Sequence, residues 1–202
     1  GNINVNSDKY VGGIVGYINI YSMKTLQIDR CYNIGSLNGG YAGGIVGYIY
    51  SNGIISNCYN KGNIYGNYAG GGIVGQCSEI PNIKNCYTSG NIKVTTDNDY
   101  WSVGAILGKI GASEYSTSNI ENTYYLESIE IQGPQILELG NSVSDQYMKT
   151  REFYNKLNVD NAWIYRENLY PRLHTGPTAK IQSVQELIVE NRLKKFKITT
   201  EI

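Results

Sequence analysis

The sequence predicts an all-β fold: a parallel β-solenoid of about four coils of roughly 30 residues each, followed by a small helical or irregular C-terminal cap. Two observations predict it. The pentapeptide Gly-Gly-Ile-Val-Gly recurs at residues 12–16, 43–47 and 71–75, with a degenerate copy at 104–108. A second block, centred on Cys-Tyr or Thr-Tyr, follows each copy. Repeats at this spacing indicate stacking, because each unit then buries the apolar face of its neighbour.

The composition agrees with β structure and excludes several classes of protein. The 202 residues include 24 glycines and 19 tyrosines, and 41% hydrophobic residues are enough to bury a core. Basic and acidic residues number 17 each, whereas sequence-independent nucleic-acid binding needs a basic surface, so we expect no nucleic-acid partner. The chain lacks any run of about 18 apolar residues, so we expect no membrane insertion by this segment.

Each coil is expected to contain three short strands, one for each apolar stretch. Within the second and third copies these stretches read GGIVGY, GIISNCY and GNIYG. Glycine and asparagine separate them, and both tolerate the positive φ expected at the corners. Stacking should align equivalent isoleucines in two ladders: Ile14, Ile45, Ile73 and Ile106, and then Ile28, Ile55, Ile83 and Ile120. The unequal coil lengths place outward insertions at residues 19–25, 94–99 and 111–118.

One repeat position holds small, weakly polar side chains: Cys31, Cys58, Cys86 and Thr123. Adjacent strands in register would separate these side chains by about 4.8 Å, more than the Cβ separation of about 3.8 Å that a disulfide prefers. We therefore expect buried free thiols here, with Cys77 as another core filler. Metal ligation is not expected, because there is no Cys-x-x-Cys spacing and the lone His174 lies outside the repeats.

Two aromatic series follow the repeat. The first, expected to stack as structure, contains Tyr32, Tyr59, Tyr87 and Tyr124. The second precedes the glycine motifs and contains Tyr10, Tyr41, Tyr68 and Trp101. Structural stacking is the simpler interpretation of the second series as well. The alternative is an aromatic platform for sugar rings, which makes this second series the candidate ligand-binding site.

The two repeated blocks together resemble the GLUG motif repeat of bacterial surface and secreted proteins. The resemblance covers residues 10–129 in four copies, and Asn-Cys-Tyr-Asn-Lys-Gly-Asn-Ile-Tyr-Gly at 57–66 shows its second block in full. It implies a β-solenoid within large extracellular proteins, such as adhesin-like proteins and some immunoglobulin A-cleaving peptidases, whose repeats lie outside the catalytic domain. Two departures, the degenerate copy at 104–108 and Thr123, suit a last coil, because terminal repeats are atypical.

The solenoid is expected over residues 1–135 and the cap over 136–175. Ser144 can cap a helix that reaches about Asn158, or Thr150 can begin a second short helix within that range. The apolar residues of this segment, with Trp163, are expected to cover the open end of the solenoid, because an uncovered end exposes strand edges.

Residues 176–202 are expected to form a linker and the first strands of a following module. The period-2 alternation that ends at Ile202 favours strands, and a capping box that begins at Ser183 leaves a short helix as the alternative. The chain begins at Gly1 with no signal-like stretch, and we interpret it as a segment of a longer protein.

The predicted function is a non-catalytic structural or presentation module of a larger extracellular bacterial protein, surface-bound or secreted, with no cofactor. Polysaccharide hydrolysis would need clustered carboxylates, and repeat residues such as Asp8, Asp29 and Glu121 share no repeat position. One alternative is an adhesin domain that binds a host glycan or protein, and another is an accessory domain of a secreted peptidase. Neighbouring modules of the same chain are further expected partners.

Calcium binding stays open at one insertion, which contains Asp97 and Asp99. Hard cations prefer clustered oxygen ligands, but calcium takes about six or more of them, so other residues would have to contribute. The simpler interpretation is a polar loop tip.

Overall fold

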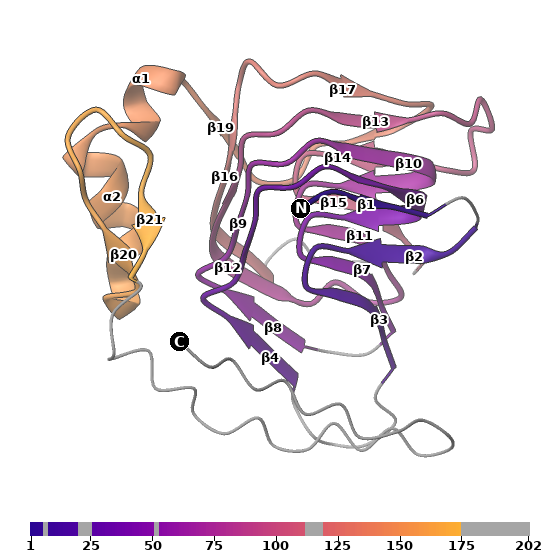
Figure 1. Ribbon diagram of the computed structural model, residues 1–202, viewed down its shortest axis with the longest axis horizontal. Helices are drawn as coiled ribbons and strands as arrows, with labels where there is room; N and C mark the ends of the chain where they lie inside the picture. Colours follow the sequence, from indigo (N-terminus) through magenta and orange to yellow (C-terminus); the bar gives the residue numbers. More distant parts are fainter. Residues whose placement is uncertain (6–7, 20–25, 51–52, 112–118, 175–202) are drawn as a thin grey trace.

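A computed structural model describes the chain over residues 1–5, 8–19, 26–50, 53–111 and 119–174. Within these ranges the protein is a parallel β-solenoid with a small helical cap, which confirms the predicted fold class (Figure 1). Most of two predicted insertions, at residues 20–25 and 112–118, lies outside the described residues, as does the predicted module at 176–202.

The chain winds through three walls and returns to the first wall with each coil. The first coil contains β2 (Tyr10–Gly12), β3 (Val15–Ile18), β4 (Leu26–Asp29) and β5 (Tyr32–Asn33), preceded by β1 (Ile3–Asn4). The second contains β6 (Leu37–Gly43), β7 (Val46–Ile49), β8 (Gly53–Ser56) and β9 (Tyr59–Asn60). The third contains β10 (Ile64–Gly71), β11 (Val74–Cys77) and β12 (Asn82–Thr88). The fourth contains β13 (Ile92–Val94), β14 (Val103–Gly104), β15 (Leu107–Ile110) and β16 (Ile120–Leu126).

Three further strands stack on the fourth coil: β17 (Ile131–Gln132), β18 (Ile136–Leu137) and β19 (Asn141–Val143). The stack of parallel strands therefore continues beyond residue 135, where the sequence places the start of the cap. Each wall is a parallel sheet: β1-β6-β10-β13-β17 with β2, β14 and β18 beside it, then β15-β11-β7-β3, then β19-β16-β12-β8-β4 with β5 and β9.

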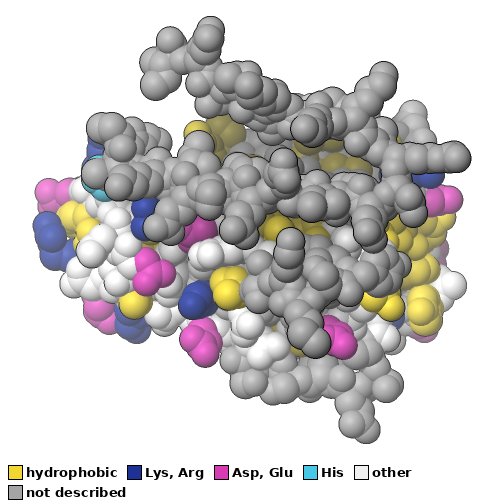
Figure 2. All heavy atoms as spheres, turned by 90° about the horizontal axis from the view of Figure 1, so that it is seen from below, with side chains coloured by type: hydrophobic (Ala, Val, Ile, Leu, Met, Phe, Trp, Pro, Cys, Tyr) yellow, Lys and Arg dark blue, Asp and Glu magenta, His cyan; other side chains and the backbone are white. Residues whose placement is uncertain are grey.

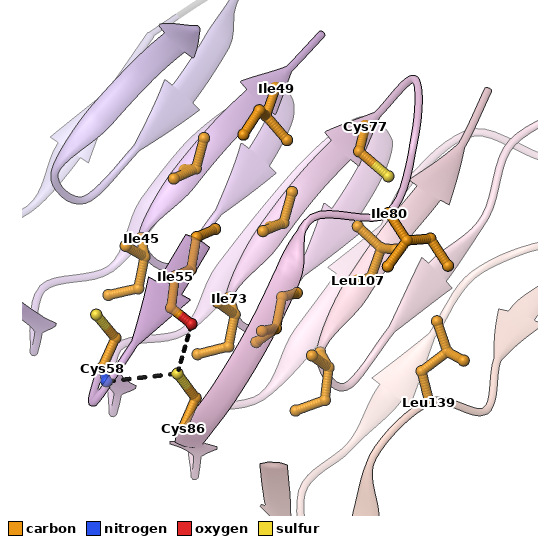
Figure 3. Packing of buried hydrophobic residues seen from close by; sticks show 14 of the residues in the cluster. Ile45, Ile49, Ile55, Cys58, Ile73, Cys77, Ile80, Cys86, Leu107 and Leu139 are labelled. Atoms are coloured by element: carbon orange, nitrogen blue, oxygen red, sulfur yellow. Dashed lines mark hydrogen bonds between the residues drawn. The ribbon is translucent and has the colours of Figure 1, made fainter. Parts of the chain in front are cut away.

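The predicted isoleucine ladders form the core. Ile55 pairs with Ile28 on one side and with Ile83 on the other, and Ile83 pairs in turn with Ile120. On the neighbouring wall Ile45, Ile73 and Ile106 are fully buried (Figure 3 shows this packing). Burial of each such side chain contributes about 1.5–3 kcal/mol.

Ile14, predicted to continue the ladder of Ile45, Ile73 and Ile106, has a side chain that is 44% exposed. Its backbone follows the pattern, since the Ile14 N–H donates to the Ile45 carbonyl. The ladder therefore reaches Ile14 as predicted, and its side chain is exposed because the first coil is the edge of the stack, with β3 as the edge strand of its sheet.

The repeated glycines are required by close packing of backbones. A Cβ atom on Gly43 would lie 1.9 Å from the Val46 carbonyl oxygen, and one on Gly44 would lie 2.1 Å from the Gly72 carbonyl oxygen. The prediction that glycine or asparagine supplies positive φ at the corners is confirmed for asparagine but not for glycine, since Gly140, in the last coil, is the one described glycine with positive φ. The left-handed corner residue stands just before each Cys or Thr of the second block: Arg30, Asn57, Asn85 and Asn122.

The cap contains two short helices, one of the two arrangements left open by the sequence. Helix α1 (Asp145–Met148) begins after Ser144, whose side chain accepts from the Tyr147 N–H, and α2 (Arg151–Leu157) begins after Thr150. A 3-10 turn, η2 (Asn158–Asp160), and an antiparallel pair, β20 (Trp163–Ile164) and β21 (Arg172–Leu173), complete it.

The cap lies beside the solenoid, along the wall formed by β9, β12 and β16 (Figure 1). Its core joins the cap residues Phe153, Leu157 and Trp163 to Tyr59 and Tyr87 of the wall. The prediction that these side chains cover the open end is therefore wrong. The cap packs instead on the flat tyrosine rings of the side wall.

Polar contacts also attach the cap to the corner asparagines. Asn57 and Asn85 both donate through Nδ2 to Oδ2 of Asp160, at 3.3 and 3.4 Å. The Tyr87 hydroxyl donates to the Pro171 carbonyl at 2.8 Å. Successive coils thus present donors that the cap accepts, and the cap is held by hydrogen bonds as well as by apolar burial.

Replacement of Trp163 by alanine tests the cap. Trp163 is 2% exposed and contacts Tyr59 and Tyr87, with ring centroids 5.9 and 5.7 Å away. We expect Trp163→Ala to lower the free energy of unfolding by about 3–5 kcal/mol, because a large buried side chain leaves a cavity. Thermal melting followed by circular dichroism measures the effect. Trp163→Phe is the matched control and should lose less, because the Trp163 Nε1 has no hydrogen-bond partner to forfeit. A Trp163→Ala protein with wild-type melting would contradict this account of the cap.

Candidate functional site

Seven aromatic side chains form a continuous cluster at the edge where the first two walls meet, and we call this cluster the aromatic face. Its members are Tyr10, Tyr17, Tyr41, Tyr48, Tyr68, Tyr100 and Trp101. Neighbouring ring centroids lie 4.8 to 5.4 Å apart, from Tyr10–Tyr48 at 4.8 Å to Tyr41–Tyr68 at 5.4 Å. All four residues of the predicted ligand site belong to it.

Strand register builds the first half of the face. Tyr10 pairs with Tyr41 across β2 and β6, and Tyr17 pairs with Tyr48 across β3 and β7. The Tyr17 and Tyr48 rings lie parallel, with 6° between their planes and 5.3 Å between centroids. Tyr17 and Tyr48 were missed as site residues, although both directly follow a Gly-Gly-Ile-Val-Gly block and could have been found by that spacing.

A backbone irregularity adds the second half. Ala69, not Tyr68, is the register partner of Tyr41, and the pairing of β10 with β6 shifts between Gly66 and Ala69. The extra residue before the third glycine motif places Tyr68 one position earlier in the chain than Tyr41 is in its repeat. The Tyr68 ring still contacts Tyr41, and it continues to Trp101 at 5.3 Å. A bulge of this kind redirects a side chain without ending the sheet.

The aromatic face is accessible to solvent. Tyr10, Tyr17 and Tyr100 are 37%, 48% and 64% exposed, and the other members are half-buried. Figure 2 shows hydrophobic side chains gathered at the right-hand edge of the molecule, the side on which Figure 1 places β2 and β6. The rings therefore combine mutual packing with exposed faces and edges.

Polar groups border the rings. The Tyr68 hydroxyl donates to Asp8 Oδ1 at 2.7 Å, and Lys109 Nζ lies 4.2 Å from the Tyr100 ring centroid. The hydrogen bond to Asp8 raises the pKa of Tyr68, and desolvation by burial raises the pKa of Tyr10 and Tyr41. These phenols are therefore neutral near pH 7 and can donate hydrogen bonds. Aromatic surface with a few polar groups at its border is suited to a ligand that has an apolar ring face and peripheral hydroxyls.

The other tyrosine series has a structural role. Tyr32, Tyr59 and Tyr87 stack with centroids 5.0 and 5.1 Å apart and interplanar angles of 7° and 3°, which confirms the predicted stacking. Tyr124 leaves the stack and meets Phe153 of the cap edge-on at 5.1 Å. The cap covers this wall, so Tyr87 is fully buried and Tyr59 only 6% exposed.

The four thiols are free, as predicted: Cys31, Cys58 and Cys86 share one repeat position with Thr123, whereas Cys77 lies on β11 in another wall. Cys58 Sγ donates to the Ser56 carbonyl at 3.0 Å, and Thr123 Oγ1 donates to the Glu121 carbonyl at 2.8 Å, which explains why Thr can replace Cys. Cys31 differs from the expectation because it is only half-buried in the first coil. Burial raises the pKa of Cys77 to about 12 and that of Cys58 well above its usual range, so neither is a nucleophile near neutral pH.

The described residues contain no group of three or more His, Cys, Asp or Glu side chains that could hold a metal ion. Asp97 and Asp99 are exposed in their loop, where the Asn98 side chain accepts from the Tyr100 N–H at 2.9 Å. None of the helices in the described ranges combines the length and the apolar character needed to cross a membrane.

Comparison with known proteins agrees with the repeat and with the fold. The GLUG motif family matches residues 38–65, a span from β6 to β10 that includes one complete turn of the solenoid. A crystal structure from Bacteroides ovatus, described as a "putative immunoglobulin A1 protease", superposes with a TM-score of 0.56 at 24% sequence identity. The alignment covers 85% of this chain and 54% of that one, so this chain spans about half the length of its structural neighbour. A search of curated proteins finds no match.

The burial of Cys58, Cys77 and Cys86 predicts a specific pattern of chemical modification. With iodoacetamide at about pH 8, Cys58, Cys77 and Cys86 should stay unmodified in the folded protein, because alkylation requires an accessible thiolate. Half-buried Cys31 should react first, although slowly, since its hydrogen bond with Cys58 and its burial raise its pKa. Mass spectrometry of digested protein identifies the modified residues, and the same reaction in urea should label all four. Rapid labelling of Cys58 or Cys86 without denaturant would show that the ladder is open in solution.

Proposed function

We propose that this chain is a non-catalytic presentation module of a larger extracellular bacterial protein. The solenoid is a stack of short coils whose core side chains, and many of whose polar groups, contact the neighbouring coils. Such a stack is well suited to hold a surface at a fixed position. The GLUG motif at residues 38–65 supports a repeat module, and the longer structural neighbour supports a place beside other modules. Cell-surface or secreted location is part of this proposal.

One observation carries the proposal beyond a simple spacer. The protein has two rows of aromatic rings, and these rows differ in how far they are exposed to solvent. The cap covers Tyr59 and Tyr87 of the Tyr32 row and leaves Tyr32 itself 45% exposed, whereas no member of the aromatic face is buried and Tyr17 and Tyr100 are 48% and 64% exposed. Clustered exposed aromatic side chains are expensive to leave in water and are typical of binding surfaces. The outward surface is therefore the functional part of the module.

The second candidate function, favoured by the same contrast, is glycan binding by the aromatic face. Tyr10, Tyr41, Tyr68 and Trp101 provide ring surface, and Asp8 and Lys109 provide hydrogen-bonding groups at its border. A pyranose ring has one face of C–H groups that packs on an aromatic ring and an edge of hydroxyls that seeks such polar groups. A protein ligand, or a role as accessory domain of a secreted peptidase, is the competing use of this surface.

The non-catalytic part of the proposal is tested by incubation with plant and bacterial polysaccharides and with immunoglobulin A1. We expect no cleavage product by mass spectrometry, because the carboxylate Asp29 is engaged by Ser56 and Asn57, and Asp160 by Asn57 and Asn85. Hydrolysis that persists through repurification and disappears in an Asp29→Asn variant would refute the proposal.

Glycan binding is tested on a glycan array, followed by affinity measurement for each positive glycan. We expect Trp101→Ala to weaken binding by about tenfold or more, because loss of an aromatic contact at the centre of a binding surface costs at least about 1.4 kcal/mol. Tyr65→Ala is the matched control, since Tyr65 is 39% exposed on β10 and contacts none of the rings of the aromatic face. Equal loss in both variants, or binding that Trp101→Ala leaves intact, would remove the glycan role from the aromatic face.

A further inference from the structure

A cavity of about 370 Å³ opens where the cap meets the covered tyrosine row, and we call it the junction pocket. It lies on a different wall from the aromatic face. Three basic side chains line it: Lys61, which follows β9, and Arg166 and Arg172, which belong to the cap. Three rings line it as well: Tyr32, Tyr59 and Tyr170.

The charges in this pocket are uncompensated. No acidic side chain lines it, and among the described residues none of the three basic groups forms a salt bridge. Lys61 is half-buried, and its pKa is lowered first by burial and then by the nearby Arg172 charge. Like charges gathered without counter-ions repel one another, so an anion in the pocket would remove an existing electrostatic cost.

The aromatic rings hold one of these charges in place. Lys61 Nζ lies 5.0 Å from the centroid of Tyr170 and 5.5 Å from that of Tyr59, within the range of cation–π attraction. Tyr59 is itself held in the stack between Tyr32 and Tyr87. The ammonium group and the pocket wall are therefore positioned before any ligand arrives, which lowers the entropic cost of binding.

We propose that the junction pocket binds a sugar that carries a carboxylate, as the terminal or internal residue of an acidic glycan. Arginine guanidinium groups match a carboxylate with two parallel hydrogen bonds, and Lys61 adds a third point of attraction. The 45% exposed Tyr32 ring and the apolar side chains of Ile34 and Leu169 offer surface to the C–H face of the sugar. The volume lies near the lower end of the range for small-molecule sites, which suits one or two sugar rings better than an extended peptide.

Calorimetry with the whole 202-residue chain tests this site. The probes are 3′-sialyllactose, lactose as its neutral counterpart, trigalacturonate, and hexaglutamate as an acidic peptide. We expect at least one acidic sugar to bind about tenfold or more tightly than lactose, because charge-assisted hydrogen bonds exceed neutral ones by that amount. Affinity should fall from low salt to about 0.5 M NaCl, because the pocket is open to solvent and salt screens its charges.

Variants separate this pocket from the rest of the surface. Arg166→Ala and Arg172→Ala should each weaken acidic-sugar binding by about tenfold or more, and Arg172→Lys should fall between the wild type and Arg172→Ala, because it retains charge but not the fork geometry. Lys93→Ala removes an exposed charge on β13 outside the pocket and should change affinity by less than about twofold. Arg166 lies outside the strands of the cap, so it provides the result if Arg172→Ala disturbs β21.

Three results would overturn the assignment. Lactose could bind as tightly as the acidic sugars, hexaglutamate could bind more tightly than any of the sugars, or Arg166→Ala could retain wild-type affinity for the acidic sugar. Trp101→Ala tells this site from the aromatic face. If it abolishes acidic-sugar binding while Arg166→Ala does not, the ligand belongs to the aromatic face and the junction pocket proposal fails.

Discussion

Parallel hydrogen bonding between equivalent residues of successive coils is the constraint on which the rest of this structure depends. The Ile45 N–H donates to the Ile73 carbonyl and the Ile73 N–H to the Ile106 carbonyl, each at 2.9 Å. The turn beside them brings backbones so close that a Cβ atom on Gly44 would lie 2.1 Å from a neighbouring carbonyl oxygen. Most residues therefore stack on their equivalents in the next coil, and the interior holds side chains that pack against a copy of themselves or against a close substitute, as Cys86 does against Thr123.

The interior shows which side chains meet this requirement. Isoleucines interlock, tyrosines stack as parallel rings, and Asn60 accepts from the Asn33 amide at 2.8 Å while its own amide donates to the Gly62 carbonyl at 2.9 Å. Buried thiols donate within their own coil, as Cys58 does. These buried amides and thiols thus find partners within their own coil or in the next coil. What distinguishes this protein lies on its outer surfaces, where one aromatic row is covered and another is open.

The cap gives the covered wall two properties. It buries the Tyr59 and Tyr87 rings under Phe153 and Trp163, and it brings Arg166 and the β21 residue Arg172 beside Lys61. The contact that buries these tyrosine rings thus also forms the junction pocket. The aromatic face arises differently, from two in-register pairs and one bulge that brings Tyr68 and Trp101 into line.

The sequence by itself determined the solenoid, its ladders, the free thiols and the two helix caps at Ser144 and Thr150, because these depend on local propensity and on one repeated spacing. It located four of the seven members of the aromatic face and missed Tyr17, Tyr48 and Tyr100, although the spacing of Tyr17 and Tyr48 after the glycine motif was visible. Tertiary structure alone decided where the cap docks, which glycines are required by close approach, and the grouping of Lys61 with Arg166 and Arg172. The docking of the cap and the basic group depend on contacts between segments far apart in the chain, such as Tyr59 and Trp163, and the close approach of the glycines depends on how successive coils stack. No periodicity indicates which wall a non-repeating segment covers.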